Sequence, residues 1–270
     1  MGNPLANQRV RSHDWPTLIS IIAIATIGSR VSASLFQEAA CWWVDCPDVI
    51  WDDAGLARIR ATLILNLDRF RFLCASGTVG NLAGAAVAYA LSRDSRNHPT
   101  NWRLFYWAFA TLNVMAAGMG MLIGSLLGVG EWAWFFADLE PAIAWRAAGI
   151  VTAFFVLTLG LIASSKHAEL FRGRGANRAD LSFRLSVYAY AASALSYAVF
   201  SVVRFGPPTS ILTMFVGTVT IPLGVLLLPK FDRLPIARTP HQPYVAARDR
   251  RWIAAAVICF ALAAVLFKLL

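Results

Sequence analysis

Two carboxylates and a thiol lie at the ends of apolar segments, where acidic side chains are rare. Glu38 and Cys41 close the first apolar segment, and Glu131 follows the third. Burying an ionised carboxylate in hydrocarbon is costly, so such an acid normally faces a bundle interior, a cavity or a partner. Gln37 and Cys41 are four residues apart and share one helical face. These side chains are the candidates for metal binding and acid-base chemistry.

The elements that must position them are apolar helices. Hydrophobic residues make up 58% of the 270 residues and charged ones 14%, which leaves too little polar surface for a soluble domain of this size. About 20 apolar residues of helix cross roughly 30 Å of hydrocarbon. Seven segments reach this length: 17–36, 72–91, 104–129, 142–163, 185–203, 211–228 and 252–270. Because Pro222 interrupts the sixth segment, the sequence predicts an all-α, polytopic transmembrane bundle of six or seven helices.

The basic residues orient this bundle. Membrane proteins concentrate Lys and Arg in cytoplasmic loops, so the net charge of +9 does not indicate a nucleic-acid partner. With the N-terminus inside, 16 of the 24 Lys and Arg fall on the cytoplasmic side, six fall outside, and Arg30 and Arg146 lie within helices. We therefore expect a multi-pass protein of the bacterial inner membrane type, with a cytoplasmic N-terminus and an external C-terminus.

The stretches between the apolar segments are too short to fold alone. Residues 1–270 are therefore expected to form a single integral membrane domain, with the lipid bilayer as its first partner. In this topology the first and third helices run in the same direction. Glu38, Cys41 and Glu131 then emerge on one side, where they can converge on one site.

Three polar residues inside the predicted helices define a candidate polar cavity. For Arg30, an interhelical ion pair or a bond to backbone carbonyls is favoured over an anionic ligand. For Asn81 and Asn113, interhelical hydrogen bonds are favoured over contacts with a substrate. Small-residue stripes also predict that the second and third helices pack closely on one another: Gly77, Gly80 and Gly84, and Gly120, Gly124 and Gly128.

Four segments, taken in order, carry a family resemblance. Gln37-Glu38-Ala39-Ala40-Cys41 ends an early helix, where the family has His-Glu-x-x-His, and residues 75–82 are similar to its Gly-Pro-x-x-Asn signature. Asn113 and the run Gly130-Glu131-Trp132 are similar to its later Asn and Gly-Asp-Trp pattern, and residues 206–229 to its closing Asn-Pro-Gly and small-residue helix. The chain thereby resembles the site-2-protease-type intramembrane zinc metallopeptidases, in particular their small bacterial multi-helix members.

The resemblance implies a zinc site. In the family, two motif histidines and a later carboxylate hold Zn²⁺, and the motif glutamate activates a metal-bound water. Transferred by position, Glu38 becomes the general base, and Gln37, Cys41 and Glu131 become the metal candidates. Both histidine positions differ from the family, however, and Gln is a poor zinc ligand.

These differences favour a non-catalytic relative that binds membrane-protein segments and carries no cofactor. The alternatives are an active zinc peptidase with altered ligands and a small transporter or channel, so whether the chain is an enzyme stays open. Cys41 has three readings: a local disulfide with Cys46, an inert thiol or a metal ligand.

Overall fold

The computed structural model describes residues 14–45, 67–94, 101–172, 178–205, 223–227 and 248–269. Within these ranges the chain is helical and has no strand, which confirms the all-α prediction. Its elements are α1 (Trp15–Trp43), α3 (Leu67–Asp94), α4 (Asn101–Leu127), α5 (Gly130–Phe135), α6 (Ala142–Arg172), α7 (Arg178–Phe205), the 3-10 turn η3 (Gly224–Leu227) and α11 (Arg250–Leu269).

Four of these helices are long and apolar enough to span a membrane, namely α1, α3, α4 and α6. Each covers one of the predicted segments. Most of the sixth predicted helix, 211–228, lies outside the described residues, where only 223–227 can be followed. A membrane location is therefore compatible with the fold.

Most of the described helices begin before the predicted segments, because the residues that precede each apolar stretch are also helical. The start of α1 is fixed by Asp14, whose carboxylate accepts hydrogen bonds from the Thr17 backbone N–H at 3.2 Å and the Thr17 hydroxyl at 2.7 Å. This side chain satisfies an N–H that the first turn of a helix cannot pair internally. Pro16, which has no N–H, occupies the same turn without loss.

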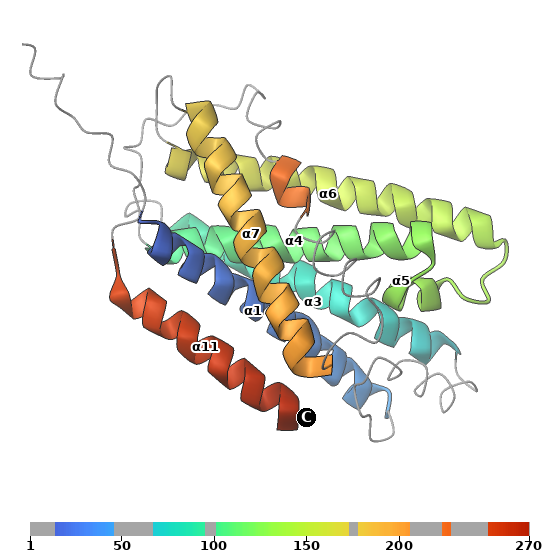
Figure 1. Ribbon diagram of the computed structural model, residues 1–270. Helices are drawn as coiled ribbons and strands as arrows, with labels where there is room; N and C mark the ends of the chain where they lie inside the picture. Colours follow the sequence, from blue (N-terminus) through green and yellow to red (C-terminus); the bar gives the residue numbers. More distant parts are fainter. Residues whose placement is uncertain are drawn as a thin grey trace, which may run out of the picture.

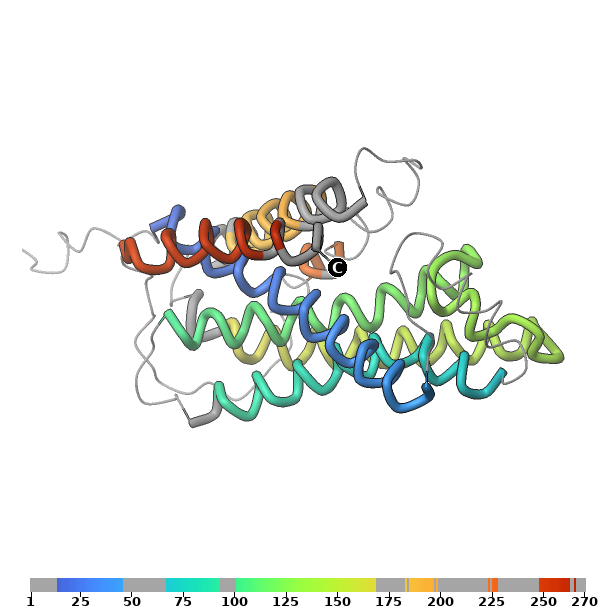
Figure 2. The backbone as a smooth tube through the Cα atoms, turned by 90° about the horizontal axis from the view of Figure 1, so that it is seen from below, coloured from blue at the N-terminus to red at the C-terminus, as the bar shows by residue number. Residues whose placement is uncertain are grey.

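The N-termini of α1, α4 and α11 meet at one end of the bundle, called here the Trp15 end. Asp249 donates its N–H to the Thr17 hydroxyl at 3.0 Å and accepts from the Asn101 amide at 3.2 Å. The ring of Trp15 also lies 4.0 Å from that of Tyr188 in α7. The helices α1, α4, α7 and α11 therefore run in one direction, while α3 and α6 return (Figures 1 and 2).

The main apolar core joins α1, α3, α4, α6 and α7 and is centred on α4. Its fully buried side chains include Leu18, Ile21, Ile22, Leu104 and Met115. Val225 of η3 is buried in the same core, so this described part of the sixth predicted segment packs inside the bundle. A second, smaller cluster lies at the opposite end, called here the Glu131 end, and consists of Ala40, Phe70, Leu73 and Cys74, with Trp134 and Phe135 against it.

The helices that carry the glycine stripes, α3 and α4, pack side by side as predicted, although most of the stripe glycines contact other elements. Gly80 of α3 faces α1, where an added Cβ would lie 2.6 Å from the Phe36 Cβ. Gly118 and Gly124 of α4 face α6 and α5 instead, where a Cβ would meet Leu157 at 2.6 Å and Trp132 at 2.5 Å. The glycines thus set the approach of α3 to α1 and of α4 to α6.

Candidate functional site

A hydrogen bond between α1 and α5 is the centre of the candidate site. The Gln37 side-chain amide donates to Glu131 Oε1, and both side chains are half-buried. Gly77 of α3 lies directly against the pair, since a Cβ there would be 2.8 Å from Gln37 Nε2 and 3.2 Å from Glu131 Oε2. The structure therefore brings together two of the residues that the sequence nominated as metal candidates, and Gly77 leaves room for them.

The short helix α5 presents Glu131 to this site. Gly128 and Gly130 have φ values of 65° and 72°, in the left-handed region that favours glycine, and they turn the chain out of α4 and into α5. No residue of α5 itself is buried. This six-residue helix was not predicted, although the Gly-Val-Gly sequence before it is a turn signal.

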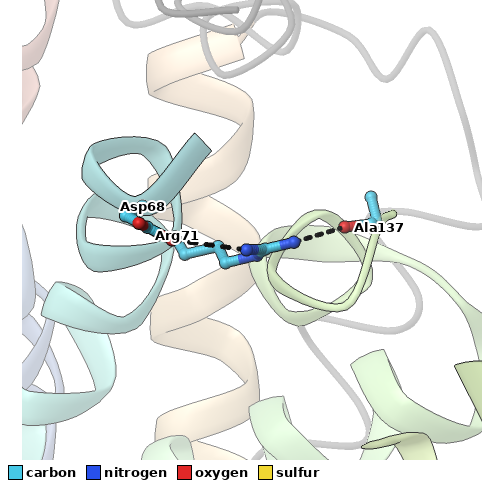
Figure 3. A network of polar contacts seen from close by, with 3 residues as sticks. All are labelled: Asp68, Arg71 and Ala137. Atoms are coloured by element: carbon cyan, nitrogen blue, oxygen red, sulfur yellow. Dashed lines mark hydrogen bonds and ion pairs between the residues drawn. The ribbon is translucent and has the colours of Figure 1, made fainter. Parts of the chain in front are cut away.

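Two further contacts hold the α5 region in place. Trp132 Nε1 donates to the Thr78 hydroxyl of α3 at 2.9 Å. Arg71 of α3 donates to the Ala137 carbonyl, just after α5, at 3.3 Å and pairs with Asp68 at 3.4 Å (Figure 3). Together with the Gln37–Glu131 pair, these contacts attach α5 to α1 and α3 through side chains.

The surroundings of Glu131 act on the pKa of its carboxyl in both directions. Burial raises the pKa of the Glu131 carboxyl, while the hydrogen bond from Gln37 and the positive charge of Arg30 lower it. Arg30 thus acts electrostatically on Glu131 from the middle of α1. A carboxyl in this environment can accept a hydrogen bond and exchange a proton.

Glu38 and Cys41 do not take part in the Gln37–Glu131 pair. Glu38 is exposed on a face of α1 next to the one that carries Gln37, since successive helical residues point about 100° apart. Cys41 is disulfide-bonded, whereas Cys74 and Cys259 are not. The expected partner Cys46 lies outside the described residues. A sulfur in a disulfide has no thiolate to offer a metal ion. Among the described residues, no group of three His, Cys, Asp or Glu side chains is placed to hold a metal.

The predicted polar residues Arg30, Asn81 and Asn113 lie at the middle of α1, α3 and α4. Asn113 is fully buried, accepts from the Ser32 hydroxyl of α1 at 3.1 Å and donates to the Phe109 carbonyl at 2.8 Å. The first of these bonds joins two helices, as predicted for Asn113. Asn81 is 9% exposed, and its Oδ1 has no hydrogen-bond partner among the described residues.

A second polar cluster, the Ser164 cluster, was missed by sequence reasoning. Ser164 of α6 bonds the Tyr89 hydroxyl at 2.8 Å and accepts from the Thr111 hydroxyl at 3.0 Å, and its carbonyl accepts from Trp107 Nε1 at 2.9 Å. Ser164 and Thr111 are at most 1% exposed. Hydroxyl residues scattered through three apolar helices gave no spacing signal that they meet.

No family model matches this chain, and no curated protein or solved structure matches it.

Proposed function

We propose that the protein is a non-catalytic integral membrane protein that binds segments of other membrane proteins at its Glu131 end. The proposal adopts the resemblance to the site-2 metallopeptidases as an account of the fold and of the position of the site. In this proposal the protein has no peptidase activity, and the Gln37–Glu131 pair lies where the family has its zinc ion.

The observation that carries this proposal is the hydrogen bond from Gln37 to Glu131. A catalytic zinc needs three strong protein ligands and an open position for water. Here the amide of Gln37 donates to the carboxylate that would have been a ligand. The exposed position of Glu38 and the disulfide at Cys41 also argue against a catalytic zinc site.

A binding role is supported by the apolar surface around the site. Leu35 and Trp42 on α1 and Phe72 on α3 are large exposed apolar side chains on the helices that carry Gln37 and Gly77. In a bilayer such surfaces face lipid or another transmembrane helix, whose polar groups gain from hydrogen bonds in hydrocarbon. Segments of membrane proteins therefore fit the chemistry of this end of the bundle.

The proposal also covers further membrane spans, besides the four long apolar helices, and the orientation of the chain in the membrane. We propose that α7, the segment 211–228 and α11 also cross the bilayer, which gives seven spans. The N-terminus is proposed to be cytoplasmic and the C-terminus external in a bacterial inner membrane, so the Glu131 end faces outward. Arg71, one of the six basic residues on the proposed outer side, has a structural role there, because it donates to the Ala137 carbonyl.

Metal content separates this proposal from an active peptidase. Protein purified in mild detergent is expected to contain no stoichiometric zinc, and Glu131→Ala is expected to leave that content unchanged. The Gln37→His/Cys41→His double variant restores the family's ligands beside Glu131 and is expected to bind about one zinc per chain. Zinc in the wild type that is lost in Glu131→Ala would refute the non-catalytic proposal. Failure of the double variant to gain zinc would refute the resemblance.

A further inference from the structure

We infer that the protein has a second site at the middle of the bundle, where Asn81 binds a small hydrogen-bond donor that arrives beneath α5. The ligand is water or a small protonated amine, which share the donor chemistry. This site does not depend on the binding of membrane-protein segments, because its ligand would be a small water-soluble molecule.

The buried amide of Asn81 is the first observation. Its Oδ1 is buried and accepts no hydrogen bond from the described residues, although Asn113 at a similar depth makes two. An acceptor that is buried without a hydrogen bond carries a large desolvation cost. Buried polar atoms are normally paired with protein or ligand groups, so Asn81 Oδ1 points to a donor that is not part of the chain.

The position of Asn81 relative to α5 is the second observation. Gly77 and Thr78, which contact Glu131 and Trp132, lie one helical turn before Asn81 on α3. A turn of four residues is about 6 Å along the helix axis. Asn81 therefore lies directly deeper in the bundle than the contacts that hold α5.

The attachment of α5 makes passage to Asn81 feasible. The helix has no buried residue and follows two glycines with positive φ, and side-chain hydrogen bonds hold it at Glu131 and Trp132. Because α5 packs on the smaller apolar cluster and not on the main core, its displacement costs less than the opening of the main core. The substrate sites of secondary transporters likewise lie near the middle of the bilayer.

The donor class follows from oxygen atoms carried by α1 and α5. Ser29 is 1% exposed, and its Oγ likewise has no hydrogen-bond partner among the described residues. Glu131 adds carboxylate oxygens above Asn81, and Arg30 balances their charge. These oxygens match a ligand that carries N–H or O–H groups, such as water or a primary ammonium.

Cysteine labelling in lipid nanodiscs tests access to Asn81, since both membrane faces meet the reagent. In a Cys74→Ala/Cys259→Ala background, Asn81→Cys is compared with Val79→Cys, which lies on the same helix but is 53% exposed on the outside of the bundle. A cationic methanethiosulfonate is expected to modify position 81 about tenfold faster, because a thiolate does not form in hydrocarbon. Gln37→Leu should raise the rate at position 81 further and leave position 79 unchanged.

Thermal unfolding of the wild type then distinguishes the two donors. Methylammonium chloride is compared with tetramethylammonium chloride, which has the same charge but no N–H. A rise in Tm of about 2 °C or more with methylammonium alone, absent in Asn81→Leu, identifies an amine site. Faster labelling at position 81 without such a rise in Tm identifies water as the ligand. Equal labelling rates at positions 81 and 79, in both the parent background and the Gln37→Leu variant, would overturn the inference.

Discussion

The Ser164 cluster and the Gln37–Glu131 pair are both polar contacts between helices of an apolar bundle, but they differ in almost every other property. The Ser164 cluster is neutral and buried beside the main core, and its hydroxyls bond one another. The Gln37–Glu131 pair includes a carboxyl, is half-buried and lies on an unburied helix beside a four-residue apolar cluster. Neutral, satisfied groups stabilise packing, whereas a charged group at a loosely held element is suited to binding.

The largest expected effect is at the Ser164 cluster. Ser164→Ala leaves the Tyr89 and Thr111 hydroxyls without their shared partner, and each buried group left unpaired costs about 1–3 kcal/mol. The free energy of unfolding, measured in mixed micelles, should fall by that order. Thr152→Ala in the same helix is the control, because its hydroxyl bonds only the Ala148 carbonyl and is exposed. Equal losses in both variants would mean that the Ser164 cluster has no special structural role.

A side chain at position 77 should disrupt the Gln37–Glu131 pair and leave the Ser164 cluster intact. Gly77→Leu pushes into Gln37 and Glu131 and separates α5 from α1, while the main core is untouched. Hydrogen exchange of the α5 amides is expected to become about tenfold faster, with that of α4 unchanged. Gly120→Leu serves as the control, since a Cβ there has no described atom within 4 Å. Faster exchange throughout α4 and α6 as well would contradict the separation of the two regions.

The bond from Trp132 to Thr78 should contribute a smaller amount. Trp132→Phe and Thr78→Val each remove it, so the double variant should lose less than the sum of the single losses. Hydrogen bonds between membrane helices average about 0.6 kcal/mol in such cycles. Unfolding free energies of the four proteins give the coupling. A coupling of zero would show that packing alone holds α5.

The weakest expected effect is a pH dependence at Glu131. Its pKa is raised in the folded state, so the folded protein binds more protons than the unfolded chain at pH values between the two pKa values. Stability from the protonated carboxyl is present below the unfolded pKa and decreases as pH rises through the folded one. Tm should therefore decline over that window in the wild type and stay flatter in Glu131→Gln. Identical Tm profiles would assign the pH dependence to other groups.

The helices could be predicted because hydrocarbon length leaves a long, uninterrupted apolar signal. Their ends could not, since Trp42 and Trp43 continue α1 beyond the apolar stretch. The convergence of the first helix with Glu131 followed from helix direction alone. Which neighbour met Glu131 did not follow, because adjacent residues 37 and 38 differ only in rotation about α1. The Ser164 cluster could not be predicted either, because its members come from three helices and have no shared spacing.

The most direct test of the account is the proximity of positions 37 and 131. In the Cys74→Ala/Cys259→Ala background, Gln37→Cys and Glu131→Cys are combined and treated in membranes with a short thiol cross-linker, and the linked peptides are identified by mass spectrometry. Glu38→Cys with Glu131→Cys is the matched control. We predict efficient linkage of 37 to 131 and little of 38 to 131. Preferential linkage of 38 to 131 would place the family's general base in the site and contradict the non-catalytic account.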